Sequence, residues 1–201
     1  MTSKTTKGVY TVVLAAGAAS RFGSSKQLAE LDGIALVKRA TQIATKTCAS
    51  RNLLIVGHDW YAVYRACDPP PGFLIVNDQH ETGIGSSISL AVRSIRHVAR
   101  AIVILLADQP LITPAHVAAL IDCWSGDDKE IVATAYADTM GAPALFPIDC
   151  FGDLAALAAD NGAQALLSDT RYRVQTIQFE DAAVDIDTME DLIKLRRSAR
   201  N

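Results

Sequence analysis

Several features are scarce in this chain of 201 residues, and each absence excludes a class of protein. Its four cysteines, Cys48, Cys67, Cys123 and Cys150, form no Cys-x-x-Cys pair and are too sparse for a disulfide framework, so we expect structural thiols in a reducing compartment. The longest apolar run, residues 101–107, is much too short to span a bilayer. The net charge of −3 offers no basic surface for nucleic acid. We therefore expect neither a membrane nor a nucleic-acid partner.

Targeting and repeat signals are also missing. The first residues, MTSKTTKG, are polar and lack the apolar stretch of an export signal, so a cytoplasmic location is expected. No internal repeat or low-complexity tract interrupts the chain. Its length, with half of the residues apolar and a fifth charged, is sufficient for one folded domain with a substantial core, here predicted to span residues 1–201.

The two commonest phosphate-binding motifs are absent as well. The glycines at Gly17 and Gly23 do not have the spacing of a dinucleotide-binding fingerprint, and Lys26 follows serine instead of the glycine that a P-loop requires. Residues 12–28, VVLAAGAASRFGSSKQL, nevertheless have the pattern of a buried strand that leads into a phosphate-binding loop. Gly17 allows close backbone approach, and Arg21 and Lys26 provide charges for phosphate oxygens. The structural alternative is a tight turn with two solvated basic side chains.

Apolar runs alternate with helical patterns along the chain. Strands are predicted at residues 10–15, 52–56, 73–76, 101–106, 131–135 and 174–177, and helices at 35–47, 88–97 and 114–124, with a short amphipathic helix after Thr188. This alternation predicts an α/β fold of three layers, in which a mostly parallel, Rossmann-like sheet is covered by helices on both faces. Ligands of such sheets bind at the carboxyl ends of the strands.

Acidic residues follow two of these segments. Asp108 comes directly after the most apolar strand, where a carboxylate is placed to bind a hard cation together with substrate phosphates; an Asx-turn before Pro110 is the structural alternative. Asp185 and Asp187, in VDIDTMEDL, alternate with apolar residues and so point the same way. Either could supply a second carboxylate, and the position of Asp187 before Thr188 also fits simple helix N-terminal electrostatics.

A further loop, NDQHETGIGSSISL, follows the strand at residues 73–76. Gly83 provides a flexible turn, and Ser86 and Ser87 lead into a helix whose free N–H groups could receive an anion or a carbonyl edge. An ordinary capped helix explains the same pattern equally well. His80 and Glu81 have no partners at metal-ligand spacing and are expected to form a solvated turn.

The opening loop and the string LADQPL resemble the signature of the nucleotidyltransferases that complete the molybdenum cofactor, with Phe22 where that family usually has Met. The resemblance implies the nucleotide-diphospho-sugar transferase type of fold, with a nucleotide-binding half at about residues 9–110 and an acceptor-binding half at about 111–195. It implies catalytic roles for Arg21, Lys26 and Asp108. It also implies Mg²⁺, with Mn²⁺ as an alternative, on Asp108 and Asp187. Nucleotide contacts are expected from Leu14, Ala15, Ala16, Gly17, Arg21, Lys26, Asn77, Gly83, Ser86, Ser87 and Asp108.

The acceptor half resembles the family less closely. The segments GAPALFP and ADNGAQALL are similar to the stretches that receive the second substrate, which implies acceptor contacts from Gln109, Gly141, Pro143 and Asp160. Ala142 replaces a residue that is often polar, Ala159 replaces Gly, and Gln164 replaces Arg. An anionic acceptor would therefore lose one bidentate partner at Gln164.

The LAAG form of the opening loop is typical of the CTP-dependent branch of the family. The resemblance thus implies transfer of CMP from CTP to the phosphate of molybdopterin, with release of pyrophosphate and with a molybdenum hydroxylase apoenzyme as a candidate partner. Two alternatives stay open: a nucleotidyltransferase that acts on another phosphorylated small molecule, such as a sugar or polyol phosphate, and a non-enzymatic carrier of the cytosine-dinucleotide cofactor.

Overall fold

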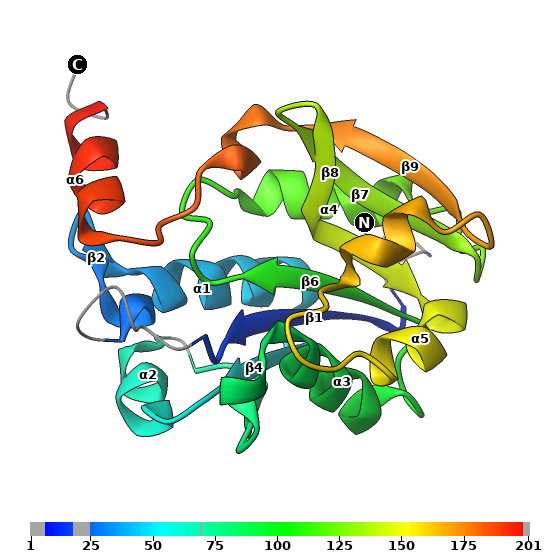
Figure 1. Cartoon of the computed structure of the whole chain (residues 1–201), viewed down its shortest axis with the longest axis horizontal. Helices are drawn as coiled ribbons and strands as arrows, with labels where there is room; N and C mark the ends of the chain where they lie inside the picture. The colour runs from blue at the N-terminus through cyan, green and yellow to red at the C-terminus, as the bar shows by residue number, and fades with distance from the viewer. Residues whose placement is uncertain (1–6, 18–24, 69, 199–201) are drawn as a thin grey trace.

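A single seven-stranded sheet runs through both halves of the chain. The computed structural model describes residues 7–17, 25–68 and 70–198. The strand order is β5-β4-β1-β6-β8-β7-β9, and only β8 runs antiparallel to its neighbours (Figure 1). The strands are β1 Val9–Ala15, β4 Asn52–Val56, β5 Phe73–Val76, β6 Ala101–Leu106, β7 Glu130–Tyr136, β8 Thr139–Pro147 and β9 Arg173–Gln178. The predicted mostly parallel α/β architecture is confirmed.

Helices cover both faces of this sheet (Figure 1). On one face lie α1 and α4, together with α2; on the other lie α3, α5 and η5. The α-helices are α1 Leu36–Cys48, α2 Trp60–Ala66, α3 Ile84–Ile95, α4 Pro114–Cys123, α5 Phe151–Ala155 and α6 Met189–Ser198. The 3₁₀ turns are η2 Lys26–Leu28, η3 His80–Thr82, η4 Ile148–Cys150, η5 Ala163–Ser168 and η6 Glu180–Ala183. None of the described helices is long and apolar enough to cross a membrane.

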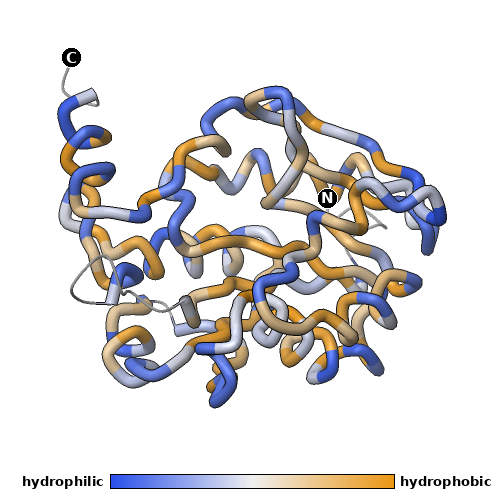
Figure 2. Tube along the Cα trace, viewed as in Figure 1, coloured by the Kyte–Doolittle hydropathy of each residue, from blue (hydrophilic) through white to orange (hydrophobic). Residues whose placement is uncertain are grey.

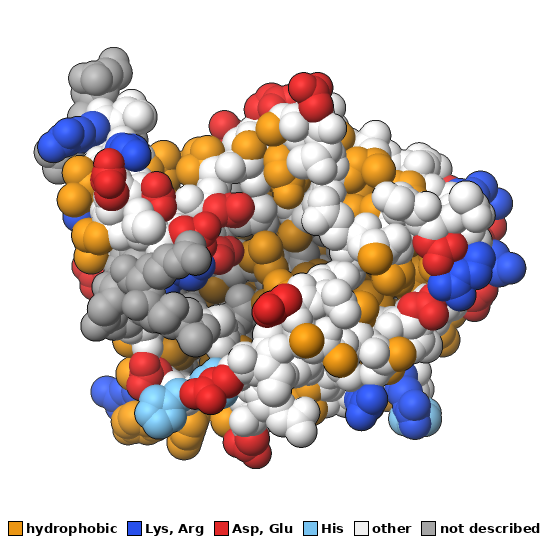
Figure 3. Space-filling view, in the orientation of Figure 1, with side chains coloured by type: hydrophobic (Ala, Val, Ile, Leu, Met, Phe, Trp, Pro, Cys, Tyr) orange, Lys and Arg blue, Asp and Glu red, His pale blue; other side chains and the backbone are white. Residues whose placement is uncertain are grey.

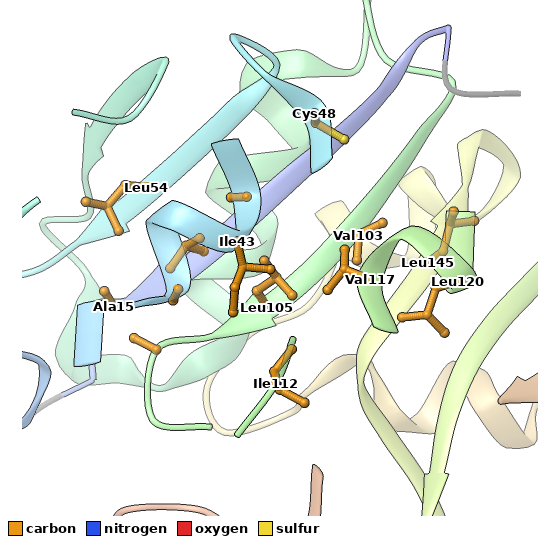
Figure 4. Packing of buried hydrophobic residues seen from close by; sticks show 14 of the residues in the cluster. Ala15, Ile43, Cys48, Leu54, Val103, Leu105, Ile112, Val117, Leu120 and Leu145 are labelled. Atoms are coloured by element: carbon orange, nitrogen blue, oxygen red, sulfur yellow. The ribbon is translucent and has the colours of Figure 1, made fainter. Parts of the chain in front are cut away.

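The central strands are buried on both faces, and the alternation of their side chains decides what each residue can contact. In β1, Val13 and Ala15 point to the α1 and α4 layer, whereas Val12 and Leu14 point to the α3 and α5 layer. Figure 4 shows the first of these layers, and the hydropathy colours in Figure 2 show that the central strands are almost continuously apolar. Ala15 is therefore part of the core, while Leu14 lies on the face that carries the cleft described below.

Strand β8 is missing from the predicted set, and its sequence explains why. Gly141 and Pro143 both weaken a strand pattern, since glycine has no side chain to pack and proline cannot donate to the ladder. The structure accommodates them in an irregularity of the β7–β8 ladder: Ala133 pairs with Ala144, but the next residue of β7, Thr134, pairs with Gly141. The antiparallel strand of the sheet was therefore not predicted, because the residues of its irregularity interrupt the apolar pattern of a strand.

The last helix is held apart from the sheet. Leu192 of α6 packs with Ile186 and with Leu31, which belongs to the small hairpin formed by β2 (Glu30–Leu31) and β3 (Ile34–Ala35). Its start has the expected reciprocal cap, because the Asp191 N–H donates to Thr188 Oγ1 and the Thr188 N–H donates to Asp191 Oδ2. This cap positions residues 184–188, which reach back toward the end of β6.

Candidate active site

A cleft of about 300 Å³ opens where β1 and β6 end. Figure 3 shows this face hollowed at its centre, with hydrophobic side chains inside the hollow and acidic side chains around it. Among its lining residues are seven predicted nucleotide contacts: Leu14, Ala16, Gly17, Lys26, Gly83, Ser87 and Asp108. The position agrees with the general location of ligand sites on open parallel sheets.

Lys26 bridges the two predicted metal-binding carboxylates. Its Nζ lies 2.7 Å from Asp108 Oδ2 and 2.9 Å from Asp187 Oδ1. Partial burial by itself would lower the pKa of Lys26, but the charges and hydrogen bonds of Asp108 and Asp187 outweigh it and raise that pKa. Lys26 is therefore a firmly protonated ammonium group that neutralises two acidic side chains brought from distant parts of the chain.

A backbone contact explains why Asp187 reaches this point. The Ile186 N–H donates to the Asp108 carbonyl at 2.9 Å, which fixes the segment after η6 beside the end of β6. Gln109 strengthens the same junction, since its Nε2 donates to the Ala182 carbonyl at 2.9 Å. Sequence spacing alone could not have predicted these two tertiary hydrogen bonds.

Asp185 forms a third acidic group at the site. The residue as a whole is exposed, but desolvation of its carboxyl, followed by the charges of Asp108 and Asp187, raises the pKa of Asp185 to about 6 from the ordinary 3.8. The preference for Asp187 over Asp185 agrees with the Lys26 contact, which involves Asp187. Both carboxylates nevertheless lie near Asp108, since the charges of Asp108 and Asp187 act on Asp185 and Lys26 contacts both Asp108 and Asp187.

The same groups suit a hard cation. Asp108 Oδ1 is buried and has no hydrogen-bond partner among the residues that the structure describes, so one carboxylate oxygen is left available beside the ammonium group of Lys26. In residues 7–17, 25–68 and 70–198, no three His, Cys, Asp or Glu side chains form a group that could hold a metal ion. A Mg²⁺ or Mn²⁺ ion at Asp108 and Asp187 would thus need phosphate oxygens and water as its remaining ligands, which is the usual arrangement for Mg²⁺.

The start of α3 forms another wall of the cleft. Asn77 Nδ2 donates to the hydroxyls of Ser86 and Ser87, each at 2.9 Å, and Ser86 in turn donates to the Gly83 carbonyl. Ser87 and Gly83 line the cleft, whereas Asn77 and Ser86 line a separate cavity. Of the nucleotide contacts predicted in this loop, Gly83 and Ser87 thus line the cleft, whereas Asn77 and Ser86 brace the loop through their hydrogen bonds.

Residues 158–162 close one side of the cleft. The Gly85 N–H donates to the Ala159 carbonyl at 2.9 Å, and a Cβ on Gly83 would come within 2.4 Å of that carbonyl. Ala159 has a φ of +53°, in the left-handed region that favours glycine, which fits the glycine that the resemblance implies at this position. Asp160, expected among the acceptor contacts, lines the same cleft as the predicted nucleotide contacts.

A second cavity of about 180 Å³ adjoins the first, and Ile84 and Leu106 line both. We call it the apolar slot; it is lined by Ile84, Ile88, Ile104, Leu106, Tyr136, Gly141, Ala142, Ala144, Phe146, Gly162, Ala163, Gln164 and Leu167. Of the predicted acceptor residues, Gly141 lines the slot. Gln109 is buried, and its side chain donates a hydrogen bond to the Ala142 carbonyl. The Pro143 carbonyl accepts a hydrogen bond from the Thr134 hydroxyl. Gln109 and Pro143 therefore do not line the slot but stabilise the part of β8 that forms its wall.

Several residues at the site were not predicted. Gln27 is buried, donates from Nε2 to the Gly17 carbonyl at 2.8 Å and lines the cleft. His80 also lines the cleft and is half-buried against Gly57, so the expected solvated turn is wrong for His80. The position of Gln27 beside Lys26 could have indicated a role, whereas no local signal marks His80. Arg21 and the rest of residues 18–24 lie outside the described residues.

Comparison with known proteins gives a consistent result. The model of the MobA-like NTP transferase domain matches residues 11–176. Purine catabolism protein PucB of Bacillus subtilis (strain 168) is 30% identical over 202 aligned positions, covering 93% of this chain and 95% of PucB. Nicotine blue oxidoreductase of Paenarthrobacter nicotinovorans is 27% identical, covering 92% and 94%.

A solved structure shares the whole fold. The complex of Rv0371c from Mycobacterium tuberculosis H37Rv with manganese has a TM-score of 0.76 and 27% identity, covering 95% of this chain and 99% of that chain. The match of the domain model includes the opening strand, Lys26, Asp108 and the β8 segment, which are the parts that build the cleft and the slot. The chain therefore belongs to the family of MobA-like NTP transferase domains.

Proposed function

We propose that this protein transfers CMP from CTP to the phosphate of molybdopterin and releases pyrophosphate. The observation that carries the proposal is the Lys26 ammonium group held between Asp108 and Asp187 in a cleft that continues into a second cavity. A nucleotide and an acceptor can thus occupy adjacent spaces. The family assignment supports nucleotidyl transfer, and the LAAG loop supports CTP through its resemblance to the CTP-dependent branch.

The charges of the cleft favour a nucleotide that enters together with a cation. The described lining contains one lysine, Lys26, but three acidic residues, Glu81, Asp108 and Asp160. A triphosphate would be repelled by this set unless its charge were neutralised. Asp108 and Asp187 would hold Mg²⁺ or Mn²⁺, which would supply charge stabilisation at the reacting phosphate. The manganese complex of Rv0371c supports a divalent ion in this family.

The protein's own groups then act by position and charge. Once phosphates approach, Lys26 can exchange its contacts with the two carboxylates for phosphate oxygens, and Arg21, on the resemblance of its loop, would add a second cation. An oxygen of the acceptor phosphate attacks the α-phosphorus of CTP, a new P–O bond forms, and the bond to the bridging oxygen breaks so that pyrophosphate leaves. Transfer in this form requires no covalent enzyme intermediate.

The base preference depends on the first turn after β1. Ala16 is 6% exposed and lines the cleft next to Gly17, so its backbone and methyl group are placed to contact a base or ribose. A glycine here, as in the guanylyltransferase form of the loop, would remove that methyl group. We therefore assign the choice of cytosine to the region of Ala16.

The test is pyrophosphate release with CTP, and separately with GTP, in the presence of Mg²⁺ and molybdenum-loaded molybdopterin. Asp108→Asn serves as the inactive variant, and Asp122→Asn on α4, an exposed aspartate outside the cleft, as the matched control. Turnover with CTP alone supports the proposal. Turnover with GTP would overturn the base assignment, turnover only with a sugar or polyol phosphate would overturn the acceptor, and stoichiometric binding without pyrophosphate would indicate a carrier.

A further inference from the structure

Three consecutive residues at the turn η2 contact three different parts of the fold. The Ser25 hydroxyl donates to the carboxylate of Asp59, the residue that precedes α2. Lys26 lies between the two carboxylates described above. Gln27 donates from Nε2 to the carbonyl of Gly17, the second residue after β1, at 2.8 Å. A displacement of η2 would therefore disturb all three contacts together.

The turn is itself fixed by backbone and core contacts. The Leu28 N–H donates to the Ser25 carbonyl at 2.9 Å, and the Leu28 side chain packs against the core of the α1 and α4 layer. Gln27 is 5% exposed. Neighbouring groups restrict the rotamers of such a buried side chain, so its amide stays directed at the Gly17 carbonyl.

The Gly17 carbonyl lies beside a cleft in which further negative charge is unfavourable. Gly17 lines this cleft, and the described lining includes three acidic side chains but one lysine. A carbonyl oxygen carries partial negative charge, so it would repel the oxygens of a phosphate group if it were unpaired and free to turn. The hydrogen bond from Gln27 offsets this charge and fixes the direction of the carbonyl.

We propose that Gln27 is a positioning residue for nucleotide binding, which acts by holding the Gly17 carbonyl away from the incoming phosphates. This inference rests on the proposed function, since it gives Gln27 a role in binding the nucleotide of that reaction. Gln27 acts through Gly17, whereas Lys26 and Asp108 keep their own contact. Loss of the amide should therefore lower the affinity for CTP more than the rate of transfer.

Two substitutions of similar size separate hydrogen bonding from packing. Gln27→Met keeps the length of the side chain but removes the donor. Gln27→Glu keeps the shape and introduces a carboxyl that can donate to the Gly17 carbonyl only when it is protonated, a form that burial favours. Gln42→Met and Gln42→Glu are matched controls, because Gln42 on α1 also donates from Nε2 to a backbone carbonyl, that of Asp68, and does not line the cleft.

The test combines binding with turnover. Isothermal titration calorimetry measures the Kd for CTP with Mg²⁺, and pyrophosphate release with molybdenum-loaded molybdopterin measures kcat. At pH 8, both Gln27 variants should bind CTP about tenfold more weakly than the wild type, because the Gly17 carbonyl loses its donor. Their kcat should stay within about threefold of the wild-type value.

A change to pH 5 gives a readout that packing alone would not alter. Gln27→Glu should recover to within about threefold of the wild-type affinity, since its carboxyl can then donate, whereas Gln27→Met should stay about tenfold weaker. The other ionisable groups of the cleft are shared by all variants, so each Kd is divided by the wild-type value at the same pH. The Gln42 variants should match the wild type at both pH values, and circular dichroism compares the folds.

Wild-type affinity in Gln27→Met, or a Gln27→Glu protein that stays weak at pH 5, would overturn the inference. A loss confined to kcat would overturn it as well. If Gln27→Met does not fold, the comparison of Gln27→Glu at the two pH values decides, because it is made within one protein. The expected pattern of CTP binding without pyrophosphate release would overturn the proposed function alone, whereas wild-type turnover with unchanged CTP binding in Gln27→Met would overturn this inference alone.

Discussion

The cleft and the apolar slot share two residues, Ile84 and Leu106, but are specified by opposite physical principles. The cleft brings charges together: Lys26, Asp108 and Asp187 meet within hydrogen-bond distance. The slot has no charged side chain and depends on the fit of aliphatic and aromatic walls. Electrostatic recognition of a polyanion needs a few groups in strict positions, whereas apolar recognition spreads over many contacts of small energy.

Substitutions in the cleft and in the slot should therefore differ in the size of their effects. A change in one cleft residue removes an interaction with no substitute nearby, so its effect should be large and confined to nucleotide chemistry. A change in one slot residue alters shape, so its effect should be smaller and confined to the acceptor. The variants below change the cleft, the slot or the segments that support them, in order of decreasing expected effect.

Asp108→Asn should remove most nucleotidyl transfer, with a fall in kcat of about 10³-fold, since a charged group at the reacting phosphate is lost. Asp108 does not line the slot, so the affinity for molybdopterin should stay within twofold of the wild-type value. Pyrophosphate release and fluorescence anisotropy measure the two effects, with Asp122→Asn as control. An active Asp108→Asn protein would exclude Asp108 from metal binding and catalysis.

Gly141→Ala should raise the KM for the acceptor by about tenfold. The new Cβ would lie too close to Tyr136 Oη, so the phenol must move and the slot becomes narrower. The KM for CTP should not change. Gly152→Ala is the matched control, since a Cβ at Gly152 meets no atom within 4 Å. Equal changes in both KM values would mean that the two regions are not independent.

Lys26→Met should have opposite effects on the binding of the metal ion and on the binding of the nucleotide. Removing the ammonium group leaves Asp108 and Asp187 unpaired, so Mn²⁺ binding without nucleotide should strengthen by roughly tenfold, while CTP affinity falls. Paramagnetic resonance titration of Mn²⁺ measures the first effect. Lys38→Met removes a more exposed lysine, paired with Asp68 on the surface, and should change neither. Weaker Mn²⁺ binding in Lys26→Met would contradict this interpretation of the bridge.

Ala159→Gly should stabilise the loop that follows α5 and carries Asp160 into the lining of the cleft. The left-handed φ of Ala159 costs about 1–2 kcal/mol, and the added chain entropy of glycine offsets about 0.5–1 kcal/mol, so a net gain of about 0.5–1 kcal/mol in unfolding free energy is expected. Urea denaturation measures it. Ala158→Gly, without a positive φ, should instead lower stability slightly, and a gain of equal size there would refute the argument.

The smallest expected effect is on the pH dependence of the unfolding free energy, and it arises from His116, which contacts Thr134 next to β8. His116 Nε2 lies 2.8 Å from Thr134 Oγ1, and the Thr134 hydroxyl donates to the Pro143 carbonyl, so the imidazole must donate from Nε2. Burial lowers the pKa of His116 below its ordinary 6.5. The unfolded chain therefore takes up a proton first, and this contribution to stability is lost as pH falls from 6.5 through the lowered folded pKa.

His116→Gln keeps a donor but does not titrate, so its unfolding free energy should decline less between pH 7 and pH 5 than that of the wild type. Urea denaturation at several pH values checks the difference. His97→Gln, at an exposed histidine, serves as control and should follow the wild-type curve. A wild-type decline that survives in His116→Gln would assign it to another group.

Much of the sheet could be predicted because its strands carry their own signal. β4, β5 and β6 were predicted with their observed bounds, since each is an almost continuous apolar run. For β4 and β6 this run reflects burial on both faces, whereas β5 is a partly exposed edge strand. β8 could not be predicted in the same way, because Gly141 and Pro143 break the pattern and only the bulge opposite Thr134 accommodates them. The covering of each face by particular helices also follows from packing and not from local propensity.

The sequence by itself determined the α/β class and the carboxylate at the end of β6, because each depends on residues that are neighbours in the chain. The phosphate-binding role of the loop after β1 stays a prediction. Only the tertiary structure decided that Lys26 lies between Asp108 and Asp187, that Asp160 faces the cleft, and that Gln109 and Pro143 lie behind the slot. These contacts join residues separated by up to 161 positions, and their geometry depends on the register of strands and on single long-range hydrogen bonds, which local sequence does not encode.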